Sequence, residues 1–339
     1  MASAEQIKAL VASHSEGDEE RFYAIAMQVA ASEAKRGNAK FAEDIRKIIN
    51  QTRSSPINAS INAAKSPTLI VRPNRDLSDL LTVSYPRIQF SDMALNSSIQ
   101  LRLDRVLKEQ YNWEKLKAHG LNPRRKLLFT GPPGTGKTMS ASALAGELNL
   151  PLFVVRLDGL ITKFMGESIT KLRIIFDAIQ NTRAVYLFDE FDSIGTHRGF
   201  VNDVGEIKRV LNSFLMYIEQ DISNSIIIAA TNHPQNLDFA LFRRFDELLE
   251  FELPSTDLIV EMIKSKLESF KKKKIDYVKI AEIAEGLSFA DIASACEATL
   301  KEAVINNQTH LTTDDILTPI EERVKFHSRY VTKNFNNVS

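Results

Sequence analysis

The sequence contains one cysteine, Cys296, so no disulfide can form within the chain, and this usage fits a reducing cytoplasm. Its six histidines are scattered and show no paired Cys and His spacing of a transition-metal site. No apolar run approaches the ~20 residues that cross a bilayer, and the first ten residues lack the features of a secretion signal. We therefore expect a cytoplasmic protein with no membrane partner. Cys296 lies in a helical pattern beside alanines, which favours packing over a nucleophilic role.

A net charge is also absent, because 43 Lys and Arg residues balance 43 Asp and Glu residues. No long basic run with interleaved aromatic residues occurs. The densest basic cluster, residues 271–274, is typical of a solvated helix end or a hinge. Nucleic-acid binding draws much of its affinity from cationic contacts to phosphates. The sequence therefore gives no reason to expect a nucleic-acid partner.

A glycine-rich loop is the strongest signal that is present. It lies between an apolar run at 126–130 and a helical pattern that starts at Met139. Glycines let the backbone N–H groups curl around phosphate oxygens at the positive end of a helix. Lys137 can then reach the β- and γ-phosphates, and the Thr138 hydroxyl can bind Mg²⁺. The loop predicts a nucleoside triphosphate site that includes Met139 and these loop residues: Gly131, Pro132, Pro133, Gly134, Thr135, Gly136, Lys137 and Thr138.

Two acidic residues follow a second apolar run. Residues 184–188 read as a strand that is buried on both faces, and Asp189 and Glu190 stand at its end. With the glycine-rich loop, they complete a metal-dependent phosphate site: Asp189 is expected to hold Mg²⁺ through water. Glu190 is expected to polarise the water that attacks the γ-phosphate.

The pattern along the chain predicts four segments. Residues 1–50 show two amphipathic stripes separated by a break, as in a helical hairpin, and we interpret this hairpin as a docking module. Residues 51–84 are rich in Ser, Asn, Thr and Pro and read as a linker. In 85–254 strands and helices alternate, which predicts an α/β domain with a parallel sheet. Residues 255–339 are helical, with one stripe formed by Leu258, Met262, Ile263 and Leu267.

The order of these motifs closely resembles the classical clade of the AAA ATPases, a family of ring-forming motors, over about residues 85–321. The stretch 188–194 resembles the second acidic motif of that family, with an extra acid at Asp192. The stretch 229–232 resembles the sensor strand, in which Asn232 positions the lytic water. The resemblance implies ATP and Mg²⁺ as ligands. It also implies a five-stranded parallel P-loop core with a C-terminal helical lid, and a hexameric homo-oligomer.

Residues 237–246 resemble the second region of homology, whose arginines enter the site of a neighbouring subunit. An arginine there can neutralise charge on the transferring phosphoryl group. The common two-residue insertion between the arginines is missing here. We therefore assign the role first to Arg244, which directly precedes Phe-Asp, and second to Arg243.

Two further segments carry the resemblance. Residues 163–168 resemble the first pore loop, which implies that Lys163, Phe164 and Met165 contact a translocating protein chain. A second pore loop is expected within 196–205. Residues 286–292 resemble the lid segment that closes over the nucleotide and place Ala290 in the pocket. Many family members have glycine where Phe289 stands.

These features favour an ATP-hydrolysing remodeller that acts on proteins through a central pore. Its substrates are recruited through the hairpin, and a separate protease is one conceivable partner. The alternative is an ATP-controlled scaffold, inhibitor or chaperone of one partner protein, such as a toxin or protease. A nucleic-acid motor is the third hypothesis, and the balanced charge and the aromatic pore loop argue against it. A scaffold does not need Phe164, whereas a threading motor does.

Overall fold

The computed structural model describes residue 77 and residues 79–160, 167–192 and 204–335. The chain divides into two compact units, Met1–Ile70 and Val71–Ser339, and every described residue belongs to the second. The predicted hairpin at 1–50 lies outside the described residues. The same holds for Lys163, Phe164 and Met165 of the first pore loop and for most of the predicted second pore loop.

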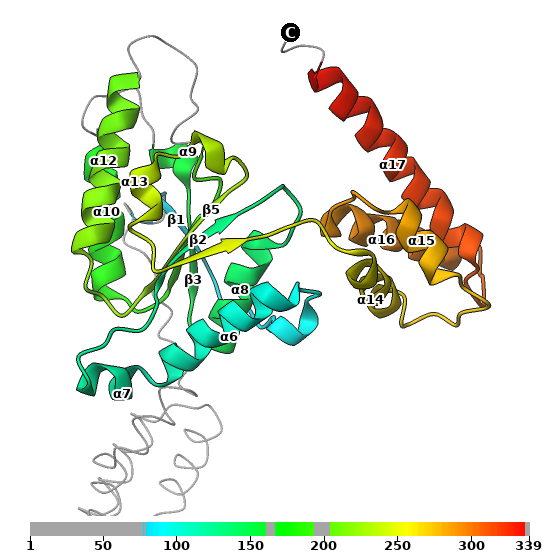
Figure 1. Cartoon of the computed structure of the whole chain (residues 1–339), viewed down its shortest axis with the longest axis horizontal. Coiled ribbons are helices and arrows are strands. Elements are labelled where there is room, and N and C mark those ends of the chain that lie inside the picture. Colours follow the sequence, from blue (N-terminus) through cyan, green and yellow to red (C-terminus); the bar gives the residue numbers. More distant parts are fainter. Residues whose placement is uncertain (1–76, 78, 161–166, 193–203, 336–339) are drawn as a thin grey trace, which may run out of the picture. The chain divides into compact units, whose positions relative to one another are not determined.

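A six-stranded sheet forms the centre of the described unit, with strand order β1-β3-β4-β5-β2-β6 (Figure 1). All neighbouring strands except β1 and β3 pair in parallel. The five parallel strands confirm the predicted core. The antiparallel edge strand β1 is an addition, and it falls inside the segment predicted as a linker, 51–84. The strands are β1 Leu81–Ser84, β2 Lys126–Thr130, β3 Leu152–Val155, β4 Val185–Phe188, β5 Ile226–Thr231 and β6 Glu247–Glu250.

Helices cover both faces of this sheet, because the central strands are apolar on both sides. In β4, Tyr186 and Phe188 pack toward α10 and α12, whereas Val185 and Leu187 pack toward α6 and α8. Strand side chains alternate between faces, so a strand buried on both sides needs a continuous apolar run. The helices of this part are α6 Ser97–Tyr111, α7 Trp113–Ala118, α8 Lys137–Glu147, α9 Leu157–Leu160, α10 Glu167–Asn181, α12 Val204–Gln220 and α13 Phe239–Phe242, with short 3-10 helices η1 Phe90–Asp92 and η2 Pro234–Asn236.

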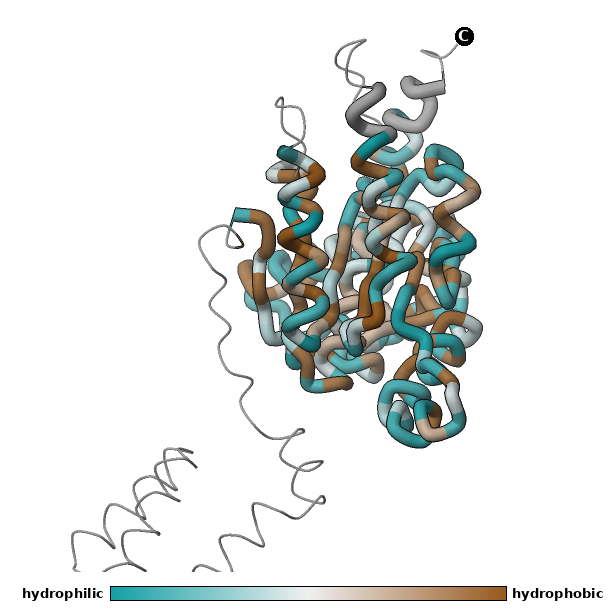
Figure 2. Tube along the Cα trace, turned by 90° about the vertical axis from the view of Figure 1, so that its left-hand side faces the viewer, coloured by the Kyte–Doolittle hydropathy of each residue, from teal (hydrophilic) through white to brown (hydrophobic). Residues whose placement is uncertain are grey.

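The C-terminal part is helical and has a core of its own. Its helices are α14 Thr256–Lys266, α15 Tyr277–Ile283, α16 Phe289–Ile305 and α17 Thr313–Phe335. Cys296 is buried in this core, and burial raises the pKa of its thiol to about 11, so the thiol is a packing group. We call this part the lid. Hydrophobic and hydrophilic residues alternate along the helices, as expected where one face packs on a core (Figure 2). No helix among the described residues is both long and apolar enough to span a bilayer.

Candidate functional site

A cavity of about 520 Å³ lies between the carboxyl ends of the parallel strands and the lid. The ends of parallel strands are the usual ligand position in such sheets. Most of the predicted site residues meet here. Those that line the cavity are Pro133, Gly134, Thr135, Gly136, Lys137, Thr138, Met139, Asp189, Glu190, Asn232 and Ala290.

The glycine-rich loop has the conformation that its sequence requires. Gly131 has a φ of 139°, and a Cβ there would lie 2.0 Å from the Phe251 carbonyl oxygen. Gly134 has a φ of 75°, and a Cβ there would lie 2.5 Å from the Ser288 hydroxyl of the lid. A side chain at either position would meet backbone strain and a steric clash. The loop therefore packs against Phe251, the residue after β6, on one side and against the lid on the other.

The Lys137 ammonium is held inside this loop. Its Nζ donates to the Gly131 carbonyl at 2.8 Å and to the Pro132 carbonyl at 2.7 Å, which is how these two residues serve the site without lining the cavity. Burial lowers the pKa of Lys137, while Asp189 and Asp192 act in the opposite direction. A cation that is buried next to carbonyl oxygens is prepared to bind phosphate oxygens.

Two oxygen groups stand beside the lysine. The Thr138 hydroxyl donates to Asp189 Oδ2 at 2.7 Å, which joins the start of α8 to the end of β4. A hydroxyl and a carboxylate at the mouth of a phosphate loop form the oxygen donor set that Mg²⁺ prefers. The residues therefore fit the expected metal.

Glu190 is exposed next to this pair, and its backbone has a φ of 49°. Positive φ is unusual for a residue with a side chain, and such strain is often found at functional positions. The Phe191 N–H donates to the Ala230 carbonyl at 2.8 Å, which fixes the turn. Glu190 itself lines the cavity.

Asp192 has a role that the sequence reasoning did not assign. Its Oδ1 accepts a bond from the Thr231 hydroxyl at 2.8 Å and one from the Asn232 N–H at 3.3 Å. The carboxylate is almost fully buried between β4 and β5. It therefore ties Asn232 to the strand end that carries Glu190.

Three other parts of the cavity wall were not predicted, and all lie far from the loop in the sequence. They are residues 91–94 in and after η1, a face of α14, and Phe289 with Ala293 on α16. Met262, which the helical stripe assigns to the core, lines the cavity as well as packing on the lid core. The unpredicted lining residues are Ser91, Asp92, Met93, Ala94, Glu261, Met262, Ser265, Lys266, Phe289 and Ala293.

The lid is joined directly to the phosphate loop. The Ala290 N–H donates to the Gly134 carbonyl at 3.1 Å. Ser288 and Asp291 form a capping box at the start of α16, which fixes the helix end that presents this N–H. Ala290 thus contacts the loop through its backbone, and Phe289 lies beside it in the cavity wall.

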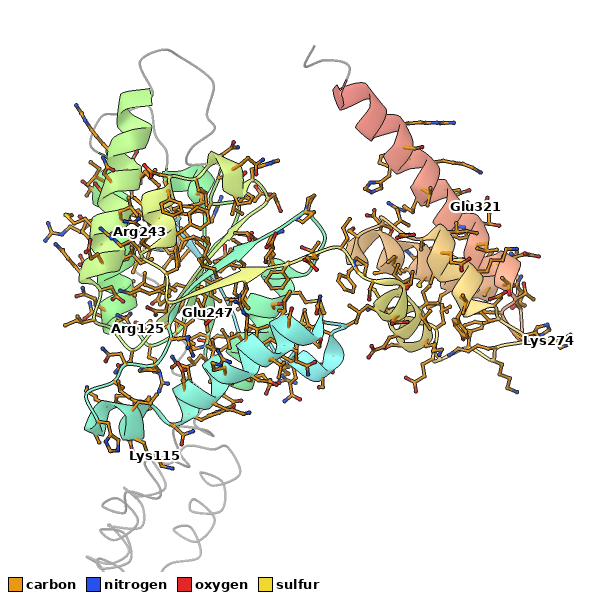
Figure 3. The ribbon with its side chains drawn as sticks, viewed as in Figure 1. Lys115, Arg125, Arg243, Glu247, Lys274 and Glu321 are labelled. Carbon is orange, nitrogen blue, oxygen red and sulfur yellow. The ribbon has the colours of Figure 1, made fainter. Side chains whose placement is uncertain are left out.

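The two arginines lie elsewhere. Neither Arg243 nor Arg244 is among the described residues that line the cavity. The Arg243 guanidinium lies over the Phe239 ring at 5.2 Å, and its place in the α/β part is shown in Figure 3. Arg244 pairs with Glu219, with 3.0 Å between Nη2 and Oε2. Both arginines therefore lie outside the lining of the cavity of this chain.

Comparison with known proteins gives consistent matches. Residues 127–253 match the family described as "ATPase family associated with various cellular activities (AAA)". An uncharacterized AAA family ATPase, y4kL, from Sinorhizobium fredii is 33% identical over 329 residues, which cover 96% of each chain. A proteasome-activating nucleotidase from Sulfurisphaera tokodaii is 33% identical over 71% of this chain and 64% of its own length. A probable inactive ATP-dependent zinc metalloprotease of Arabidopsis thaliana chloroplasts is 31% identical, and the match spans 28% of that protein.

Proposed function

We propose that this chain, which belongs to the AAA family of ATPases, hydrolyses ATP and uses the energy to remodel protein substrates as a ring. The observation that carries the proposal is the meeting of Lys137, Glu190 and Asn232 in one cavity closed by the lid. Lys137 would hold the β- and γ-phosphates. Glu190 would accept a proton from the attacking water, which Asn232 would help to orient. The single buried cysteine fits a cytoplasmic setting.

Thr138 and Asp189 are the residues that would hold Mg²⁺. When bound, the ion neutralises charge on the phosphate oxygens. The protein's own part is positioning: the bond between Thr138 and Asp189 aligns their oxygens, and Asp192 fixes Asn232 relative to Glu190. Preorganisation of this kind lowers the reorganisation needed in the transition state.

The active assembly in this proposal is a homo-oligomer, most simply a hexamer. Arg244 would enter the cavity of a neighbouring subunit, with Arg243 beside it. The separation of both arginines from their own cavity supports this arrangement. A guanidinium at the γ-phosphate can raise the hydrolysis rate by ~10³–10⁵ in related phosphate enzymes.

The action on proteins is supported by the relatives. The nucleotidase relatives are named for activating a proteasome, so a partner protease is one specific form of the proposal. Lys163, Phe164 and Met165 would grip the substrate chain, and the predicted hairpin at 1–50 would recruit it. The proposed division of the rest of the chain is a linker at 51–84, an α/β ATPase part at 85–254, and a helical lid with the C-terminal tail at 255–339. In the alternative proposal, an ATP-controlled scaffold, the ATP site is the same and the pore loop at 163–168 has no role.

Hydrolysis is tested by replacing Glu190 with Gln, which keeps the side-chain size and removes the base. We expect ATP binding to persist while turnover falls by about two to four orders of magnitude. Measurements are the Kd for ATP and steady-state phosphate release. Glu285→Gln, at an exposed lid position away from the cavity, is the matched control. Wild-type turnover in Glu190→Gln would falsify the assigned role.

Substrate processing is tested at Phe164. The wild type, Phe164→Ala and a chain lacking residues 1–50 are compared on a protein trapped by Glu190→Gln. Because aromatic rings grip many side-chain types through apolar contact, we expect Phe164→Ala to hydrolyse ATP and to stop processing. The truncated chain should lose recruitment only. Normal processing by Phe164→Ala would exclude threading and favour the scaffold.

A further inference from the structure

Within the described ranges, Arg244 forms an ion pair with one side chain, that of Glu219. Glu219 near the end of α12 pairs with Nη2 at 3.0 Å, and the two side chains are 58% and 36% exposed for Glu219 and Arg244. Within the described residues, the buried Nε of Arg244 has no hydrogen-bond partner. A guanidinium carries five N–H donors in a fixed plane. Fixing one edge of that plane therefore sets the direction of the others.

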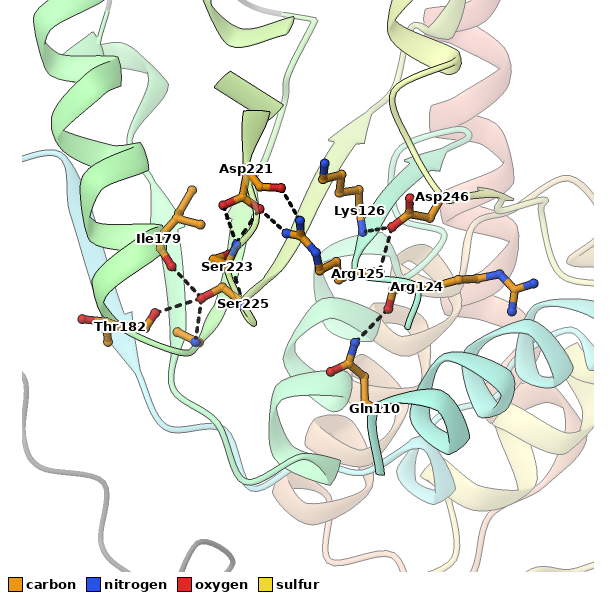
Figure 4. A network of polar contacts seen from close by, with 11 residues as sticks. Gln110, Arg124, Arg125, Lys126, Ile179, Thr182, Asp221, Ser223, Ser225 and Asp246 are labelled. Atoms are coloured by element: carbon orange, nitrogen blue, oxygen red, sulfur yellow. Dashed lines mark hydrogen bonds and ion pairs between the residues drawn. The ribbon is translucent and has the colours of Figure 1, made fainter. Parts of the chain in front are cut away.

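An exposed ion pair alone would not hold a fixed direction, because such pairs are weak and screened by solvent. Here the backbone that carries Glu219 is fixed at Asp221, two residues later in the sequence. The Asp221 side chain is fully buried, and both its carboxylate and its backbone carbonyl accept bonds from the Arg125 guanidinium. The end of α12 is thereby fixed to the residue that precedes β2 (Figure 4).

The Arg244 side is anchored in the same way. Asp246, two residues after Arg244, accepts the N–H bonds of Arg125 and Lys126, each at 2.9 Å. Its own N–H donates to the Lys126 carbonyl at 2.7 Å. Both partners of the ion pair are thus tied within two residues to one dipeptide, Arg125 and Lys126 (Figure 4).

The Lys126 side chain adds to this arrangement. Burial and Arg125 lower its pKa, whereas Asp221, Asp246 and Glu219 raise it, which places the Lys126 cation within electrostatic reach of Glu219. Glu219 therefore faces positive charge from both Lys126 and Arg244.

We propose that Glu219 is a positioning residue that orients the Arg244 guanidinium toward the site of the neighbouring subunit. This inference rests on the proposed shared site. The dipeptide 125–126 sets the frame, Glu219 engages Nη2, and the exposed part of the Arg244 guanidinium is left for an acceptor outside the subunit. The acceptor has the chemistry of a γ-phosphate. Preorientation matters because a small misplacement of a catalytic group can cost orders of magnitude in rate.

The test uses the full chain with Glu219→Ala, Glu219→Gln, Arg244→Ala and the double variant Glu219→Ala/Arg244→Ala. We expect Glu219→Ala to lower kcat about tenfold, with the KM for ATP, the oligomeric state and Tm unchanged. Glu219→Gln keeps an oxygen that accepts from Nη2, so it should retain most of the activity. The double variant should match Arg244→Ala, since Glu219 acts only through Arg244. Glu285→Ala serves as the matched surface control.

Several outcomes would overturn the positioning role. They are a wild-type kcat in Glu219→Ala, a raised kcat in Glu219→Ala, which would mark Glu219 as a restraint, or a loss of kcat in the double variant beyond that of Arg244→Ala.

A separate experiment tests the shared site itself. Mixed rings of Arg244→Ala and Glu190→Gln subunits should regain activity, because some junctions pair an intact Glu190 with an intact Arg244. If these rings stay inactive, or if Arg244→Ala is fully active, the shared site fails and Glu219 falls with it. If Glu219→Ala keeps wild-type kcat while Arg244→Ala is inactive and the mixed rings regain activity, the shared site holds and only the positioning role of Glu219 fails.

Discussion

The two ends of strand β2 are built in different ways. After its carboxyl end, Thr135 and Lys137 donate to carbonyls three to six residues away within the same loop, and longer-range contacts join the loop to Asp189 and Ala290. At its amino end, Arg125 and Lys126 contact Asp221 and Asp246, 96 to 121 residues away. The loop at the first end lines the cavity. The second end is a long-range junction that holds the end of α12 and the segment before β6 to the start of β2.

Both ends carry a lysine whose pKa is lowered chiefly by burial, Lys137 and Lys126. Their settings differ. Lys137 lies among loop carbonyls at the cavity, and Lys126 lies among the carboxylates of Asp221, Asp246 and Glu219. The same side chain thus serves ligand binding at one end and structural placement at the other. If this distinction is right, changes at the two ends should affect different measurements.

The largest effect on ATP binding is expected for Lys137→Ala. The loss of a charged partner for the phosphates should weaken ATP binding by about 10- to 100-fold, since each charge-assisted bond contributes about 1.5–3 kcal/mol. Lys126→Ala is the matched control at the other end, and its Kd for ATP should equal that of the wild type. Isothermal titration of the three proteins measures the contrast. A comparable loss in both variants would remove the proposed division between the ends.

The predicted residues that are contiguous in sequence lie together at one cavity. The loop at 131–138 and the pair Asp189 and Glu190 each stand within one stretch, so their side chains are placed by local backbone geometry. Asn232 and Ala290 were placed by resemblance, and both line the cavity. The five parallel strands were also predictable, because β4 and β5 are apolar runs buried on both faces.

The parts that were missed depend on tertiary packing. Strand β1 has four residues at a sheet edge, and its mixed burial leaves no clear pattern in the sequence. The cavity residues of α14 share a helix with the core stripe, so Glu261 and Lys266 look like ordinary surface charges. Arg125 and Asp221 are each common loop residues until the fold brings them together. Such contacts become visible only when the register of β2 and the end of α12 are known.

A second prediction concerns the junction. Asp221→Ala removes a fully buried carboxylate from the Arg125 guanidinium, which is itself only 13% exposed. Breaking one partner of such a buried pair costs about 3–5 kcal/mol. We expect a lower urea midpoint at a fixed protein concentration, with an unchanged Kd for ATP in the folded protein. Asp246→Ala, at an exposed position, should cost less. An unchanged midpoint in Asp221→Ala would show that the junction adds no stability.

The smallest effect is a pH dependence at the loop. The Lys137 pKa in the free protein is lowered from 10.5 by burial, so the proton is lost at lower pH than for an ordinary lysine. Phosphate oxygens favour the protonated form, and binding therefore takes up a proton once the pH exceeds this lowered pKa. The Kd for ATP should accordingly begin to rise at a pH below 10.5, earlier than for an ordinary lysine. Lys137→Arg stays charged at these pH values and should give a flat profile, whereas Lys126→Ala should follow the wild type. A rise in Kd that persists in Lys137→Arg would assign the titration to another group, and a change in profile for Lys126→Ala would couple the two ends of β2 electrostatically.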